Sequence, residues 1–146
     1  MLMNIDVIGG SKSQKKHVVQ MVEFCASKLM PRLNNLDITV NLCKPKGAMG
    51  YCLETDDKRT FDIEVDKTQP LRRVLETVAH EMVHVKQYAR RELHPDKHVW
   101  MGKTVNPKTV SYWDLPWEIE AHGRELGLFI RYCETYKLAK QKWTQI

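Results

Sequence analysis

The chain has 146 residues, 42% of them hydrophobic, and its 23 Lys and Arg against 18 Asp and Glu give a net charge of +5. This length and composition fit one globular domain over residues 1–146 and leave no room for a second. No apolar run approaches the roughly 20 residues of a membrane span, and the N-terminal residues lack the basic start and apolar stretch of a signal peptide. We therefore expect a cytoplasmic protein with no membrane partner.

The N-terminal half predicts a strand, a helix and three further strands. Residues 2–8 predict the first strand, and the apolar stripe that follows Ser11 predicts a helix running to about residue 32. Three strand-like runs come next, at residues 36–43, 49–55 and 60–66. Because turn-forming segments separate these runs, we expect them to form an antiparallel meander.

The C-terminal half predicts two helices on either side of an irregular stretch. Residues 70–92 begin with a proline and carry apolar residues at helical spacing, so they predict a helix. Residues 93–113 are irregular, although residues 99–105 suit a short hairpin. Pro116 opens the last helix, which is expected to reach Tyr136. The predicted fold class is α+β, with an N-terminal helix, a small, mostly antiparallel sheet and two C-terminal helices.

The cysteines and the basic residues indicate no specialised site of their own. The four cysteines contain no CxxC pair, so reduced thiols are expected. Cys25 and Cys133 fall in apolar helical patterns and are predicted to be buried. Cys43 and Cys52 flank a turn and are candidates to face each other across a hairpin. The Lys and Arg residues are spread along the chain without a nucleic-acid motif, so a nucleic-acid partner is only weakly supported.

The sequence His80-Glu81-Met82-Val83-His84, an HExxH pattern, lies inside the first of the two predicted C-terminal helices. Residues four apart lie one turn above each other on a helix, so both imidazoles can point at one metal ion. Glu81 can reach a metal-bound water without being a ligand itself. We expect His80 and His84 to be zinc ligands and Glu81 to be the general base.

A catalytic zinc ion needs a third protein ligand and one position open to water. The candidates are Glu118, Glu120, His122, His94 and His98. The metzincin continuation HExxHxxGxxH is absent, because Gln87 and Arg90 stand at its Gly and His positions. Glu118 and Glu120 cannot both face the metal, since residues two apart on a helix point about 200° apart. Glu118 is the better candidate because it shares a helix face with Ala121.

HEMVH followed by a helix that opens with PWEIEAH resembles the gluzincin arrangement, in which a downstream glutamate completes the HExxH site. In this resemblance His80 and His84 match the two histidine ligands and Glu81 matches the general base. Glu118 matches the glutamate ligand, and Ala121 matches the small residue three positions later. The two motifs are also similar to those of small metallopeptidase-like proteins of bacteria and phages, and they imply a minimal zincin-like domain.

The resemblance also implies roles for neighbouring residues. His122 stands where the thermolysin pattern has an aspartate that orients a ligand, and Glu125 is a candidate to supply that support. In zincins the strand before the motif helix forms the sheet edge beside the metal. Residues 60–66 are that strand here, so a peptide substrate is expected to add there as an extra strand. Tyr112 is expected either to lean over the metal and stabilise an oxyanion or to pack beside Trp113.

The sequence therefore predicts a zinc-dependent metallopeptidase that binds one Zn²⁺ and hydrolyses a peptide or protein with a water activated by the metal. Two alternatives stay open. In the first, His98, which lies 14 residues after His84, is the third ligand of a DNA-associated protease similar to the SprT type. In the second, the protein is an interaction module that binds zinc and has no catalytic activity.

Overall fold

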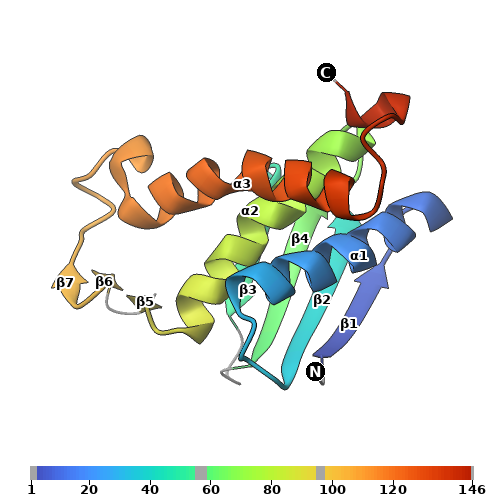
Figure 1. The fold of residues 1–146 in the computed structure, drawn as a ribbon. Coiled ribbons are helices and arrows are strands. Elements are labelled where there is room, and N and C mark those ends of the chain that lie inside the picture. The colour runs from blue at the N-terminus through green and yellow to red at the C-terminus, as the bar shows by residue number, and fades with distance from the viewer. Residues whose placement is uncertain (1–2, 55–58, 95–97, 146) are drawn as a thin grey trace.

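The computed structural model describes residues 3–54, 59–94 and 98–145, which form an α+β fold, as predicted (Figure 1). The helices are α1 (Lys12–Leu29), α2 (Leu71–Ala89) and α3 (Pro116–Thr135). The larger sheet contains β1 (Met3–Ile8), β2 (Leu36–Cys43), β3 (Gly50–Glu54) and β4 (Thr60–Asp66). The smaller sheet contains β5 (Leu93–His94), β6 (Val99–Trp100) and β7 (Lys103–Thr104). Two short 3₁₀ helices are η1 (Tyr112–Asp114) and η2 (Lys142–Thr144).

The larger sheet is mixed, so the predicted antiparallel meander is wrong. Its strand order is β1-β2-β4-β3, with β1 parallel to β2, β2 parallel to β4, and β3 antiparallel to β4. After β2 the chain passes first to the sheet edge as β3 and then returns to the centre as β4. Alternation of apolar residues predicts which side chains face the core, but it does not predict which strands become neighbours.

The strand order also separates two cysteines that were predicted to face each other. β4 lies between β2 and β3, so Cys43 pairs with Asp66 and Cys52 pairs with Ile63. The expectation of a shared hairpin is therefore wrong. Cys25 and Cys133 are buried, as predicted.

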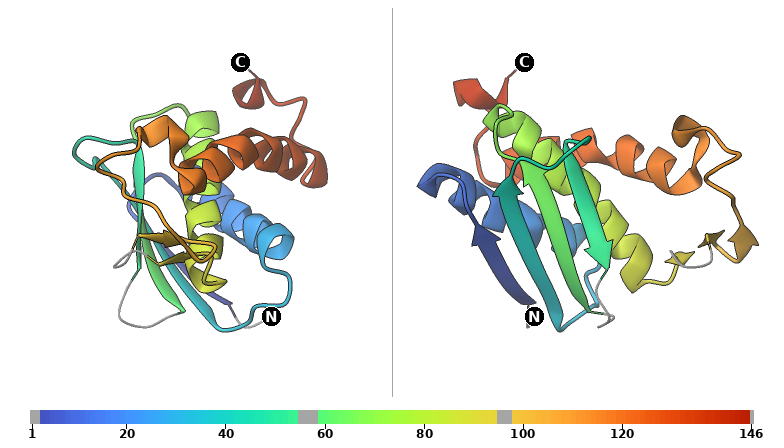
Figure 2. Two further views of the ribbon diagram at one scale, coloured as in Figure 1. Left: turned by 90° about the vertical axis from the view of Figure 1, so that its left-hand side faces the viewer. Right: turned by 180° about the vertical axis from the view of Figure 1, so that it is seen from behind.

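The helices and the sheet form three layers (Figures 1 and 2). α1 and α2 cover one face of the sheet, where alternate residues such as Val40 and Ile63 are fully buried. Ser11 caps α1 by accepting a hydrogen bond from the Gln14 backbone amide. α3 packs across α2 on the side away from the sheet. Its second half, including the fully buried Tyr132, reaches α1.

α2 is covered on both sides, by the sheet and by α3, and this determines where the HExxH residues lie. Every residue from Val74 to Gln87 is buried. Most helices at a protein surface bury only one apolar stripe, whereas here the polar face of α2 is buried as well. Polar groups taken out of water need partners, so the side chains of α3 that face α2 decide what this buried polar face can do.

The segment between α2 and α3 forms the small antiparallel sheet of β5, β6 and β7. The predicted hairpin over residues 99–105 is confirmed by the pairing of β6 with β7. Leu93, Leu115 and Trp117 form a small apolar cluster that ties this segment to the start of α3. None of the described helices combines the length and the apolar character needed to cross a membrane.

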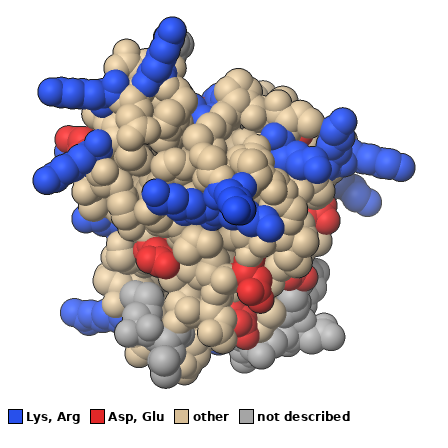
Figure 3. All heavy atoms as spheres, turned by 90° about the vertical axis from the view of Figure 1, so that its right-hand side faces the viewer, with Lys and Arg blue, Asp and Glu red and all other residues tan. Residues whose placement is uncertain are grey.

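Positive charge is concentrated at one end of the molecule, which lies at the right of Figure 1 and faces the viewer in Figure 3. α1 carries four lysines and one glutamate, and the segment after α3 adds Lys137, Lys140 and Lys142 without an acidic residue. The two segments are neighbours, because the ring of Trp143 stacks on His17 at 4.8 Å between centroids. The rest of the chain is close to neutral, so an anion would be attracted most strongly to this end.

Candidate metal centre

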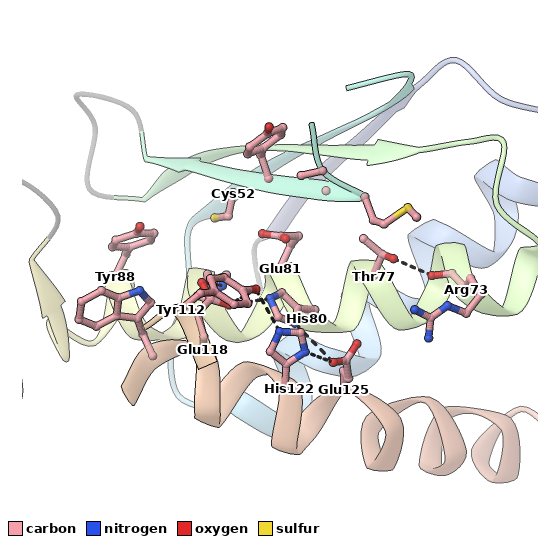
Figure 4. A pocket seen from close by; sticks show the side chains of 16 residues that line it. Cys52, Arg73, Thr77, His80, Glu81, Tyr88, Tyr112, Glu118, His122 and Glu125 are labelled. Carbon is pink, nitrogen blue, oxygen red and sulfur yellow. Dashed lines mark hydrogen bonds and ion pairs between the residues drawn. The ribbon is translucent and has the colours of Figure 1, made fainter. Parts of the chain in front are cut away.

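The histidines of the HExxH sequence meet a single carboxylate supplied by the first turn of α3 (Figure 4). His80 Nε2 lies 3.1 Å from Glu118 Oε1, and His84 Nε2 lies 3.3 Å from Glu118 Oε2. The two imidazoles are one helical turn apart on α2, with ring centroids separated by 5.0 Å. α3 begins at Pro116, so Glu118 lies in its first turn. This places Glu118 over the buried polar face of α2. The structure therefore brings together the three residues that the sequence proposed as ligands.

The second nitrogen of each imidazole faces a side-chain oxygen rather than water. His84 Nδ1 lies 2.8 Å from Gln87 Oε1, and His80 Nδ1 lies 3.6 Å from Glu125 Oε1. A proton on Nδ1 that points to an oxygen leaves the lone pair on Nε2. Both Nε2 atoms are the ones directed at Glu118, so the two rings have the orientation that zinc-binding histidines use.

Gln87 is held by contacts that fix which way its amide points. Its Nε2 donates to the Trp117 carbonyl oxygen and to Glu120 Oε1, each at 3.0 Å. With the nitrogen committed to these two acceptors, the oxygen must face His84. Glu120 also accepts a hydrogen bond from Lys86 and so lies outside the group formed by the histidines and Glu118. The contact between Gln87 and His84 was not predicted from the sequence. The spacing of three residues between them on a helix was the signal for it.

Protonation of the site reflects a carboxylate placed against buried imidazoles. Burial alone would lower the pKa of His80, but its hydrogen bonds to Glu118 and Glu125 outweigh burial and raise the pKa to about 9. Burial would raise the pKa of Glu118, but hydrogen bonds from His80 and His84 hold that pKa well below its usual range. The site therefore retains positive charge next to Glu118, in the place where a metal cation would supply it.

Glu81 lies on the other side of α2, between the helix and β3 (Figure 4), and is only 5% exposed. Burial raises the pKa of its carboxyl group above the ordinary value. β3 can approach this closely because residue 50 is glycine. A Cβ at Gly50 would lie 2.7 Å from Thr77 Cγ2 and 3.4 Å from Glu81 Oε1. Glu81 is thus held close to the histidines without being part of their contact with Glu118.

Tyr112, in η1, also reaches the site. Its hydroxyl donates to Glu118 Oε1 at 3.0 Å and lies 3.0 Å from His122 Nε2. His122 Nδ1 in turn lies 2.7 Å from Glu125 Oε1. Tyr112 also packs edge-on against Trp113, with ring centroids 5.2 Å apart, which is the packing arrangement considered for it from the sequence.

Two groups of side chains in the described parts of the chain bring potential ligand atoms within 4.8 Å of one another. They are His80 with His84 and Glu118, and His80 with His122 and Glu125. His98 belongs to neither group. It is exposed in a turn, and its backbone has a φ of 48°. His122 and Glu125, which the sequence left as alternatives for support of the site, are both part of the second group.

A cavity of about 430 Å³ opens over the site and is bordered by β3, α2, α3 and Tyr112. Because β4 lies between β2 and β3, it has strand partners on both sides. The sheet edge beside the site is therefore β3, and the expectation that a substrate would pair with residues 60–66 is wrong. Gly50, Tyr51 and Cys52 of β3 line the cavity, and the side chains of Tyr51 and Leu53 are exposed.

The donor set fits zinc by its chemistry. Two imidazole nitrogens and one carboxylate are the protein ligands that catalytic zinc sites use, with one position left for water. The Nδ1 atoms of His84 and His80 face Gln87 and Glu125. This is the outer support that histidine ligands of zinc require. Comparisons with protein-family models, curated proteins and solved structures gave no match for this chain.

Proposed function

We propose that this protein is a zinc-dependent metallopeptidase. The observation that carries the proposal is the convergence of His80 Nε2 and His84 Nε2 on the two oxygens of Glu118. An ordinary buried helix would not gather two imidazoles around one carboxylate at the floor of an open cavity, because burying these groups is costly without a cation to offset their charge.

The residues around the site have separable tasks in this proposal. A zinc ion held by His80, His84 and Glu118 would lower the pKa of a water molecule and polarise a peptide carbonyl. Glu81 accepts the proton of the attacking water on its carboxylate and passes it to the leaving amine, a task suited to a buried carboxyl group with a raised pKa. Tyr112 donates a hydrogen bond from its hydroxyl to the carbonyl oxygen as negative charge develops there.

The substrate backbone extends along β3 in this proposal. An unpaired sheet edge can bind an extended peptide through main-chain hydrogen bonds. Because β3 borders the cavity directly above Glu81, a peptide paired with it would pass between Glu81 and Tyr112. The exposed side chains of Met49, Tyr51 and Leu53 would give that edge an apolar rim.

Metal analysis combined with a peptide-cleavage assay tests the proposal. We expect the purified protein to bind one equivalent of zinc and to cleave members of a mixed peptide library. Glu81→Gln should keep the zinc and lose cleavage, because it removes the base without removing a ligand. A Glu81→Gln protein that still cleaves would overturn the assigned base, and a wild type that binds zinc but cleaves nothing would favour the interaction module.

The same assay separates the two candidates for the third ligand. Glu118→Ala should lose zinc and activity, whereas His98→Ala should keep both, because His98 lies in an exposed turn outside the His and Glu groups. The opposite result, with zinc lost only in His98→Ala, would favour the DNA-associated alternative. That alternative also predicts DNA binding that falls steeply with salt.

A further inference from the structure

A second cavity of about 740 Å³ lies along the groove between α3 and the N-terminal part of α2, beside the cavity over the candidate metal centre. The two cavities share Arg73, His122 and Glu125 as lining residues. Trp113, which precedes α3 in the sequence, and Trp143, which follows it, both line the second cavity. The second cavity therefore lies next to the site where the peptide bond would be cleaved.

The walls of this second cavity are apolar and stay open to solvent. Trp113 is 67% exposed and Leu126 is 46% exposed, although large apolar side chains are usually buried. The Trp113 ring is nevertheless held in place, because it lies 4.8 Å from the ring of His122. On the other side, the Trp143 ring contacts the His17 ring at 4.8 Å between centroids, with the two planes tilted by 53°. These rings form a preformed surface that loses little conformational freedom when a ligand binds.

The charged groups at the same wall are already paired. Arg72 Nε and Arg73 Nη1 donate to the two oxygens of Glu76, at 3.1 and 2.6 Å. Arg72 also donates from Nη1 to the Thr144 carbonyl oxygen at 2.7 Å. An apolar ligand placed against Arg72 and Glu76 would leave their hydrogen bonds intact, whereas the Arg73 side chain is 58% exposed and would lose water wherever the ligand covers it.

We infer that the second cavity binds a large apolar side chain, above all an aromatic one, of the peptide that is cleaved at the metal centre. The inference rests on the proposed function and names its substrate class: peptides with an aromatic residue placed to enter the α2–α3 groove. Burial of an aromatic ring between Trp113, Leu126 and Trp143 supplies the binding energy. The shared residues place this ring next to the scissile bond.

Tryptophan side chains allow the binding step to be tested without catalysis. N-acetyl-phenylalaninamide is titrated into the ¹⁵N-labelled protein, with N-acetyl-glycinamide as the matched probe. The indole N–H signals of Trp113 and Trp143, assigned by single Trp→Phe substitutions, should shift with the phenylalanine probe only. Trp100, which lines neither cavity, is the internal control. Equal shifts with both probes, or no shift beyond that of Trp100, would overturn the inference.

A pair of variants on one helix tests the selectivity of cleavage. Leu126 and Ile130 are each 46% exposed on α3, and only Leu126 lines the cavity. Leu126→Glu should reduce kcat/KM for peptides with an aromatic residue at the selected position at least about tenfold, because a carboxylate is placed in an apolar pocket. It should leave the zinc content and the cleavage of matched glycine peptides unchanged. Ile130→Glu should change neither.

Failure of this inference can be told apart from failure of the proposed function. If the wild type cleaves peptides but Leu126→Glu keeps the aromatic preference, the second cavity is not the selecting pocket and the peptidase proposal stands. If the wild type cleaves nothing, the indole titration still decides whether the cavity binds an aromatic ring. An aromatic preference lost in both Leu126→Glu and Ile130→Glu would also count against the pocket.

Discussion

The two halves of α3 hold histidines in opposite surroundings. In the first half, Glu118 and Glu125 face His80, and the pKa of His80 is raised to about 9. In the second half, His17 from α1 lies 3.0 Å from the hydroxyl of Tyr132, and it forms no ion pair with a carboxylate of the described residues. Burial, with a smaller effect of Lys16, lowers the pKa of His17. Both histidines are polar groups packed against α3, but only one of them is placed where a cation is stabilised.

The partners of a histidine therefore indicate its role better than its burial does. A hydroxyl partner leaves the imidazole neutral, and such a contact joins α1 to α3 without storing charge. Two carboxylates beside a buried imidazole create a negative site that a proton or a metal ion must neutralise. We therefore propose a metal-binding role for the first cluster and a packing role for the second, so a substitution in one cluster should leave the other unchanged.

The largest effect is expected from removing the carboxylate that the two site histidines share. Glu118→Gln keeps the size of the side chain but loses its charge, so zinc affinity should fall by more than the roughly 100-fold that loss of an outer partner causes. Glu134→Gln, in the second half of the same helix, removes only a surface pair with Arg131 and should leave zinc affinity unchanged. Competition with a zinc chelator measures both. Equal losses of zinc affinity in Glu118→Gln and Glu134→Gln would contradict the assignment of Glu118 as a zinc ligand.

A smaller loss of zinc affinity is expected from the glutamine that orients His84. Gln87→Leu removes the acceptor for His84 Nδ1 and should weaken zinc binding by roughly 10–100-fold. The matched control is Gln20→Leu, since Gln20 Oε1 accepts from Tyr132 in the other cluster. Gln20→Leu should cost about 1 kcal/mol of unfolding free energy and leave zinc binding intact. If both variants bind zinc like the wild type, Gln87 has no orienting role.

How much of the site the sequence could predict depends on how local each contact is. His80, Glu81 and His84 sit on one helix, so their arrangement follows from helical geometry alone. The choice of Glu118 over Glu120 followed from the same geometry on a second helix. Gln87 and Trp117 are 30 residues apart, and their contact depends on how α2 packs against α3. The periodicity of the sequence does not predict that packing.

The fold shows the same limit. Helix ends were predicted to within a few residues because prolines mark them, as Pro116 does at the start of α3. Strand pairing was predicted wrongly, because the alternation in residues 36–43 and 60–66 is equally compatible with a neighbour on either side and in either direction. The expectation that a substrate pairs with residues 60–66 came from the resemblance to zincins, and the observed strand order contradicts it, because β4 has a neighbouring strand on each side.

A change in the packing cluster should affect folding and leave the metal centre alone. Tyr132→Phe removes the hydroxyl that lies between His17 and Gln20, so we expect a loss of about 1 kcal/mol in the free energy of unfolding. Tyr136→Phe is the control, since the Tyr136 ring stacks on Tyr132 at 4.9 Å but contributes no hydroxyl to the cluster. Urea unfolding measures the stability of both variants, and chelator competition their zinc affinity. A fall in zinc affinity in Tyr132→Phe would show that the two clusters are coupled.

The smallest effect is the pH dependence that His17 gives to folding. Its pKa is lower in the folded protein than in the unfolded chain, so the unfolded chain takes up a proton first as the pH falls below about 6.5. Stability is therefore lost toward acid. The raised pKa of His80 acts in the opposite sense, because its contribution is complete below pH 6.5 and is lost only as the pH rises toward about 9.

In the metal-free protein the interval from pH 5 to 6.5 contains the effect of His17 together with that of Glu81, whose pKa is raised above its ordinary value, so the difference between the wild type and a His17 variant reports on His17. His17→Asn should flatten the loss of unfolding free energy in that interval, by less than about 0.5 kcal/mol because the imidazole is partly exposed and solvent weakens the effect. Urea unfolding at several pH values measures the slope. A His17→Asn variant with the same slope as the wild type would show that this imidazole is as readily protonated in the folded protein as in the unfolded chain. The contrast between the two halves of α3 would then rest on the carboxylates alone.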